Sequence, residues 1–124
     1  MGYSEGFNVG LDYSIENESD YALIINSDTI ADKNMLSELV KTASLDDSIG
    51  FVTGKVYFFN SNGQKNVLQT VGKESHPFTL VGPHIGALEE DIGQYDKVKE
   101  IEFSDDIFML VSRKLIKETG GYDK

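Results

Sequence analysis

The feature that most constrains the fold of this chain is an unbroken apolar run, Tyr21–Ile25, that ends abruptly in the polar residues 26–29. A short run without polar alternation is typical of a strand that is covered on both faces, as in the centre of a parallel sheet. Open α/β sheets bind ligands outside the carboxyl ends of such strands. The run therefore predicts an α/β fold in which Asn26 and Asp28 lie at a ligand-binding edge of the sheet.

Apolar periodicity and turn residues predict the elements around this strand. Helices are expected over about 9–16 after a glycine-bounded turn at residues 6–10, from an N-cap at Asp32 to Ala43, and from an N-cap at Ser112 to the glycines 120 and 121. Strands are expected at about 51–59, 67–71, 100–103 and 108–111, and Asn62-Gly63 predicts a hairpin turn between the first two. The chain should thus form a mixed, mostly parallel sheet flanked by helices, with a β-hairpin.

Composition limits the classes of function that are open to the chain. Its 124 residues suffice for one compact domain, and the absence of cysteine favours a core-stabilised protein of a reducing compartment. Lys and Arg number 11 against 21 Asp and Glu, a net charge of −10, which disfavours binding to nucleic acid or to anionic lipid. No apolar run approaches the roughly 20 residues of a membrane span. We therefore expect a single domain over residues 1–124, with no nucleic-acid partner and no transmembrane segment.

Asp28 is the first candidate for a functional residue. A carboxylate just beyond a buried strand can hold a divalent cation, and Asn26, two residues earlier, points to the same side of an extended chain. An acidic protein that binds a diphosphate needs such a cation, because like charges repel. Two other interpretations remain open. In the first, residues 26–29 form only a turn, in which Asp28 caps backbone amides. In the second, Asp28 accepts a phosphoryl group in a receiver-like domain.

Further titratable residues lie later in the chain. Asp105 and Asp106 form an acidic pair directly before an apolar run, and an ionised carboxylate that reaches a substrate hydroxyl can act as its general base. The alternative for this pair is a solvated turn or a helix N-cap. His76 and His84 are separated by eight positions without a nearby cysteine, which is a poor metal-binding signature. The acidic run 89–91 is interpreted as a solvated face.

Four short motifs follow one another along the chain. They are Gly6-Phe7-Asn8-Val9-Gly10, the run Tyr21–Ile25 with Asn26-Ser27-Asp28, the tetrad Gly93-Gln94-Tyr95-Asp96, and the segment from Met109 to Gly120-Gly121-Tyr122-Asp123. In this order they resemble motifs of the inverting glycosyltransferases of family 2, and within that family of its rhamnosyltransferase-like members. Each motif alone is weak, but the ordered set is specific and covers essentially the whole chain.

The resemblance implies a partial GT-A fold and an enzyme that transfers a sugar from a nucleotide-diphosphate sugar to an acceptor hydroxyl, with inversion. It implies that Asp28 binds a Mg²⁺ or Mn²⁺ ion and the diphosphate, and that Asn8 and Asn26 also bind substrate. It further implies a sugar or a lipid-linked glycan as acceptor. The implied place of action is the cytoplasm, including the inner face of the membrane, in the synthesis of cell-surface polysaccharide.

The chain departs from the family pattern in two respects. It is expected to be the central part of a GT-A domain, because the N-terminal nucleotide-binding βαβ unit is missing and the Glu-Asp pair with the catalytic base is expected beyond Lys124. Residues 104–108 stand where the family has a small glycine-containing segment, and their bulky acidic side chains should reshape the sugar pocket. We therefore expect the chain by itself to be catalytically inactive.

The alternative from a different class of protein is a non-enzymatic acidic α/β module. It would be either a receiver-like switch that uses Asp28 or a catalytically inactive domain that only binds sugar or nucleotide. A receiver also has an acidic pair after its first strand, and no such pair follows an N-terminal strand here.

Overall fold

The computed structural model describes residues 2–59, 66–79, 82–105 and 107–123. The chain divides into two compact units, the first comprising residues 1–52 and 106–124 and the second residues 53–105. The helices are α1 Tyr3–Glu16, α2 Met35–Ala43 and α3 Arg113–Thr119, and the strands are β1 Tyr21–Ile25, β2 Phe51–Val52, β3 Val56–Tyr57, β4 Leu68–Thr70 and β5 Phe108–Ser112. These elements confirm the predicted α/β class, while the single domain over residues 1–124 stays a prediction.

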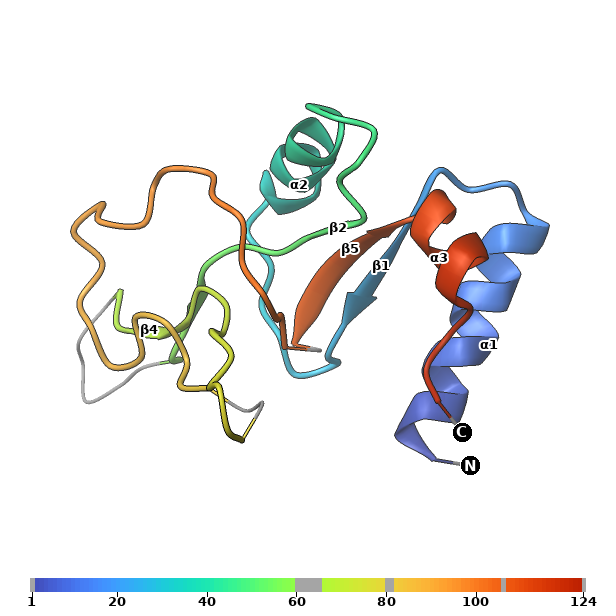
Figure 1. Ribbon diagram of the computed structural model, residues 1–124. Coiled ribbons are helices and arrows are strands. Elements are labelled where there is room, and N and C mark those ends of the chain that lie inside the picture. The colour runs from blue at the N-terminus through green and yellow to red at the C-terminus, as the bar shows by residue number, and fades with distance from the viewer. Residues whose placement is uncertain (1, 60–65, 80–81, 106, 124) are drawn as a thin grey trace. The chain divides into compact units, whose positions relative to one another are not determined.

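The first unit contains a three-stranded sheet in the order β1-β5-β2 (Figure 1). Leu110 of the central strand lies opposite Leu23 on one side and Val52 on the other, and both pairings are antiparallel. β1 and β2 therefore run in the same direction, with β5 inserted between them. The prediction of a mostly parallel sheet is not confirmed, because the described strands pair antiparallel.

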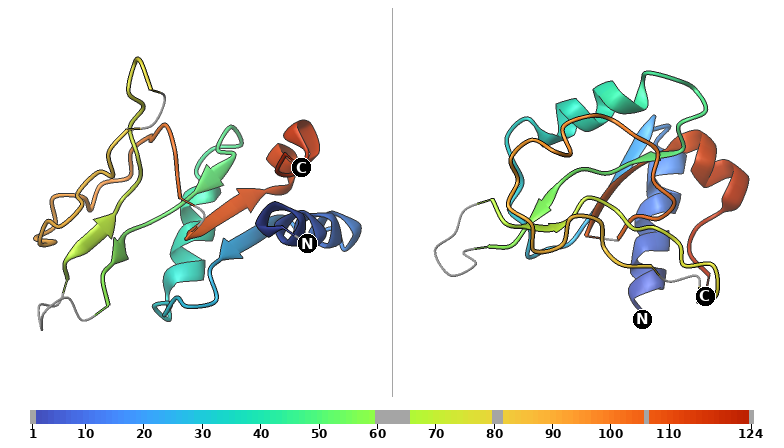
Figure 2. Two further views of the ribbon diagram at one scale, coloured as in Figure 1. Left: turned by 90° about the horizontal axis from the view of Figure 1, so that it is seen from below. Right: turned by 60° about the vertical axis from the view of Figure 1, so that its left-hand side comes forward.

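Helices on both faces of this sheet explain its unbroken apolar strands. On one face, α1 and α3 cover Ile24 and Val111, which form a buried cluster with Leu11 and Ile116. On the other face, α2 packs against β2 and β5 (Figure 1, Figure 2). Because successive residues of a strand point to opposite faces, a strand covered twice must be apolar at every position. An antiparallel strand between two helical layers thus has the sequence signature of a buried parallel strand.

The first helix begins well before its predicted start. The expected glycine-bounded turn at residues 6–10 lies inside α1, so that prediction is wrong. Glycine is a poor helix former in isolation. However, Phe7, Leu11 and Ile15 share one face of α1 and pack into the buried cluster of the first unit. Burial of this face outweighs the low helix propensity of the glycines.

The predicted ends of the other two helices are confirmed at α3 and corrected at α2. The Ser112 hydroxyl accepts a hydrogen bond from the backbone N–H of Leu115 (3.2 Å), and Gly120, with φ of 78°, terminates α3. The N-cap of α2 is Asn34 instead of Asp32. The Asp32 carboxylate accepts a hydrogen bond from the backbone N–H of Asn34 (2.8 Å), which forms a local turn before the helix.

In the second unit, β3 and β4 pair antiparallel, as the predicted hairpin requires (Figure 2). The predicted turn at Asn62-Gly63 lies outside the described residues. The strand expected at 51–59 is divided into β2 and β3, which belong to different units. The strand expected at 100–103 is reduced to a bridge between Phe103 and Lys73.

Candidate functional site

The polar segment after β1 follows an edge strand of the sheet, in which Ile24 is buried and the other four residues are partly exposed. The expectation of a strand at the centre of the sheet is therefore wrong for β1. Ile24 is 5% exposed, and the backbone N–H of Asn26 extends the pairing by donating to the carbonyl oxygen of Ile107 (2.9 Å). The backbone N–H of Thr29 then donates to the carbonyl oxygen of Asn26 (3.3 Å), so that the chain turns away from the sheet. Asn26 is half-buried at this turn, and Asp28 is exposed. The pairing of β1 with β5 thus determines where both side chains stand.

Asp28 presents a carboxylate to solvent. Within the described ranges its side chain forms no hydrogen bond and no ion pair, so no neighbouring lysine neutralises its charge. No group of three His, Cys, Asp or Glu side chains among the described residues is placed to hold a metal ion. Mg²⁺ is nevertheless commonly bound by a single carboxylate when substrate phosphates and water complete its coordination. Asp28 offers one carboxylate ligand of this kind.

Tyr3 is a neighbour of this segment that no sequence motif indicated. Its hydroxyl donates a hydrogen bond to Asn26 Oδ1 (2.7 Å), although the two residues are 23 positions apart. Its ring packs edge-on against Phe7, with ring centroids 4.9 Å apart. The first turn of α1 is thereby held beside the end of β1.

Asn8, which the family resemblance assigns to the substrate, is engaged within the protein. Its Nδ2 donates to the carbonyl oxygen of Tyr122 (2.9 Å), and its Oδ1 accepts from the backbone N–H of the same residue (2.7 Å). A Cβ atom on Gly121 would lie 2.1 Å from Asn8 Oδ1, so this close approach requires glycine. In this structure Asn8 joins α1 to the segment that follows α3.

Asp105 lies in the second unit, and its side chain is only 16% exposed. Its carboxylate forms an ion pair with Lys73, and His84 Nδ1 lies 3.0 Å from its Oδ2. Bridges from Lys73 to His84 and to Phe103 bring these segments together. Both partners of this carboxylate belong to the second unit, so the arrangement favours a structural role for Asp105. Asp106, the other candidate, lies outside the described residues.

Asp91 shows that the acidic run 89–91 is more than a solvated face. Its side chain is 10% exposed and accepts hydrogen bonds from Lys55 Nζ (2.7 Å) and from the Tyr57 hydroxyl. The hydrogen bond from Lys55, followed by that from Tyr57, lowers the pKa of Asp91 to about 2. Burial, followed by the bond to Asp91, raises the pKa of Tyr57 to about 12. Bonds to Asp91 and Asp96 raise the pKa of Lys55 in turn. Lys55, Tyr57 and Asp91 thus form a polar group that lies within the second unit and stabilises it.

We expect this group to make the stability of the second unit depend on pH in the acid range. Because folding lowers the pKa of Asp91 from 3.8 to about 2, its stabilising effect is complete above the ordinary value and is lost as the pH falls through the lower one. Lys55→Met should therefore lower the unfolding temperature near neutral pH. The difference between the wild type and this variant should shrink between about pH 4 and pH 2, as measured by circular dichroism.

Lys41→Met is the matched control for this prediction, because it removes a solvent-exposed pair with Glu38. Exposed pairs contribute little to stability, so this variant should resemble the wild type at every pH. A difference between wild type and Lys55→Met that stays constant from neutral pH to about pH 2 would contradict the assignment to Asp91.

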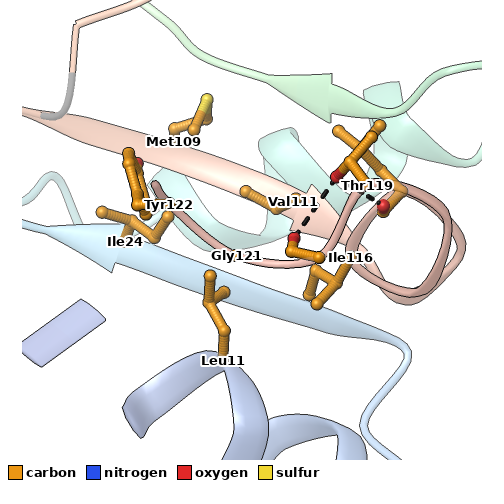
Figure 3. A pocket seen from close by; sticks show the side chains of 10 residues that line it. Leu11, Ile24, Met109, Val111, Ile116, Thr119, Gly121 and Tyr122 are labelled. Carbon is orange, nitrogen blue, oxygen red and sulfur yellow. Dashed lines mark hydrogen bonds between the residues drawn. The ribbon is translucent and has the colours of Figure 1, made fainter. Parts of the chain in front are cut away.

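Two cavities are described in the first unit, and Asp28 lines neither. A cavity of about 210 Å³ is mostly apolar and lies between α1, the sheet and α3, with Leu11 and Tyr122 among its lining residues (Figure 3). A second cavity of about 600 Å³ is lined by Tyr21 and Asp47, among others, and so lies toward the start of β1. Asp28 follows the other end of β1, where its side chain is exposed to solvent.

The helices and the comparisons with known proteins give two negative findings. No helix in the described ranges is both long enough and apolar enough to cross a membrane. No protein-family model, curated protein or solved structure matches the chain.

Proposed function

We propose that this chain belongs to a GT-A domain of an inverting family 2 glycosyltransferase, and that Asp28 binds the diphosphate of a nucleotide-sugar donor through a divalent cation. The main support is the exposed carboxylate of Asp28 in the turn after the apolar strand β1, two residues from the half-buried Asn26. The ordered motifs that resemble this family, three of which lie outside residues 21–28, are a second support. The proposed acceptor is a sugar or a lipid-linked glycan, and the proposed place of action is the cytoplasm.

The charge of the chain is the reason for including a cation in the proposal. A protein with a net charge of −10 repels a free diphosphate, and the carboxylate of Asp28 adds to this repulsion locally. A Mg²⁺ or Mn²⁺ ion neutralises charge on a departing diphosphate. Asp28 contributes a ligand to such an ion from a turn that the pairing of β1 with β5 positions. Asn26 places a carboxamide at the same turn.

Isothermal titration calorimetry with UDP, GDP, ADP and dTDP tests this proposal. We expect at least one of these nucleotides to bind in the presence of MgCl₂ and to lose its affinity when EDTA is added. Asp28→Ala should weaken that binding by about tenfold or more, because the shared cation loses its carboxylate ligand. The far-UV circular dichroism spectrum should be unchanged, since the side chain is exposed.

Asp47→Ala is the matched control, because Asp47 is also exposed but lines the cavity toward the start of β1. It should bind the nucleotide as the wild type does. The proposal is rejected if no nucleoside diphosphate binds with magnesium, or if Asp28→Ala binds as tightly as the wild type. A stable mass increase of one phosphoryl group at Asp28 after incubation with acetyl phosphate would favour a receiver-like switch instead.

A further inference from the structure

The hydrogen bond between Tyr3 and Asn26 determines which end of the Asn26 carboxamide is presented to a ligand. The Tyr3 hydroxyl donates to Oδ1 at 2.7 Å, so the acceptor end of the carboxamide is engaged. The backbone N–H of Asn26 donates to Ile107, and its carbonyl oxygen accepts from Thr29. The Nδ2 group has no partner among the described residues. One of the two lone pairs of Oδ1 is thus engaged, whereas both hydrogens of Nδ2 lack a partner in the described ranges, so the donor end is the more available end for a ligand.

The position of Tyr3 is supported by packing as well as by this bond. Its ring contacts Phe7 in an edge-on arrangement, and Phe7 in turn lies 5.5 Å from the ring of Tyr122, centroid to centroid. Phe7 and Tyr122 both pack against the buried cluster of the first unit. The Tyr3 ring is nevertheless 68% exposed, so its hydroxyl is held at the surface next to the turn.

We propose that Tyr3 is a positioning residue that directs the Nδ2 group of Asn26 toward a phosphate oxygen, so that Asn26 binds the anion while Asp28 binds the cation. This inference rests on the proposed function. It assigns separate roles to Asn26 and Asp28, whereas their spacing in the sequence suggests that both ligate the same ion. A carboxamide ligates Mg²⁺ through oxygen, whereas it binds phosphate through its N–H donors.

Magnesium pyrophosphate is the probe that separates the two roles, because it contains the diphosphate and the cation but no nucleoside. We expect the wild-type chain to bind it in calorimetry, and Asn26→Ala to bind it about tenfold more weakly through loss of the donor. Asn26→Asp should bind more weakly still, because a carboxylate offers no donor and repels the anion. If Asn26 were a cation ligand, Asn26→Asp would instead bind as tightly as the wild type or more tightly.

Tyr3→Phe tests the positioning role, since it keeps the ring on Phe7 and removes only the hydroxyl. We expect it to weaken binding of magnesium pyrophosphate by about fivefold without changing the unfolding temperature. Tyr13→Phe is the matched control, because Tyr13 lies on the same helix and is also 68% exposed. It should bind as the wild type does. Unchanged affinity in Tyr3→Phe would overturn the role of Tyr3.

The outcomes distinguish this inference from the proposed function on which it rests. If Asp28→Ala abolishes binding but Asn26→Asp binds as tightly as the wild type, the division of roles is wrong and the proposed function stands. If the wild-type chain does not bind magnesium pyrophosphate or any nucleoside diphosphate, both are wrong. In nuclear magnetic resonance spectra, the Asn26 side-chain N–H signals should shift when magnesium pyrophosphate is added. Signals that do not move while the probe binds would overturn the inference.

Discussion

Leu110→Ala is expected to lower the free energy of unfolding of the first unit by about 2–5 kcal/mol. The Leu110 side chain is 2% exposed in the central strand, between Leu23 of β1 and Val52 of β2. Truncation to alanine removes apolar contacts and leaves a cavity in the central strand, next to both neighbouring strands. Chemical denaturation followed by far-UV circular dichroism measures the loss.

Leu36→Ala is the control for this substitution, because Leu36 lies on α2 with half of its surface exposed. The same change in chemistry should cost less than about 1 kcal/mol there. Equal losses in the two variants would contradict the central place of Leu110 in the packing of the first unit.

Asn8→Ala is expected to destabilise the first unit by about 2 kcal/mol while leaving the affinity for magnesium pyrophosphate unchanged. The reason is that both ends of the Asn8 carboxamide are hydrogen-bonded to the backbone of Tyr122. The substitution should therefore release the segment after α3 from α1. Denaturation and calorimetry on the same sample separate this structural effect from an effect on binding.

Gly121→Ala provides an independent check of the same contact. Its Cβ would lie 2.1 Å from Asn8 Oδ1, so the single substitution should also destabilise the first unit. In the Asn8→Ala background the clash is absent, and Gly121→Ala should then cost much less. Additive losses would contradict the contact. A loss of affinity in Asn8→Ala without a loss of stability would show that Asn8 binds the ligand, as the family resemblance implies.

Elements that depend on local sequence were predicted correctly. The run Tyr21–Ile25 is β1 with the expected bounds, and Ser112 caps α3 as expected. An apolar run between turns and a hydroxyl at a helix start act over a few residues, so their effect is visible in the sequence. The exposed position of Asp28 follows from the same local pattern, because polar residues end the strand abruptly.

Elements that depend on distant partners were predicted incompletely. The glycines at 6 and 10 suggested a turn, yet the packing of Phe7 against Tyr122 at the other end of the chain supports a helix through them. The pairing of Lys55 with Asp91 joins residues 36 positions apart, and no spacing rule indicates such a contact. Helix propensity and charge pattern are weak compared with the burial and ion pairing that the folded chain provides.

By itself, the sequence determined the α/β class, the strand β1, the capped helix α3 and the place of Asp28 just beyond an apolar strand. Only the tertiary structure decided that β5 is inserted antiparallel between β1 and β2, that Tyr3 holds Asn26, and that Asn8 is bound to the backbone. The physical reason is that apolar runs specify burial but not the direction of the neighbouring strand. Hydrogen bonds between distant side chains exist only once packing has brought their helices and strands together.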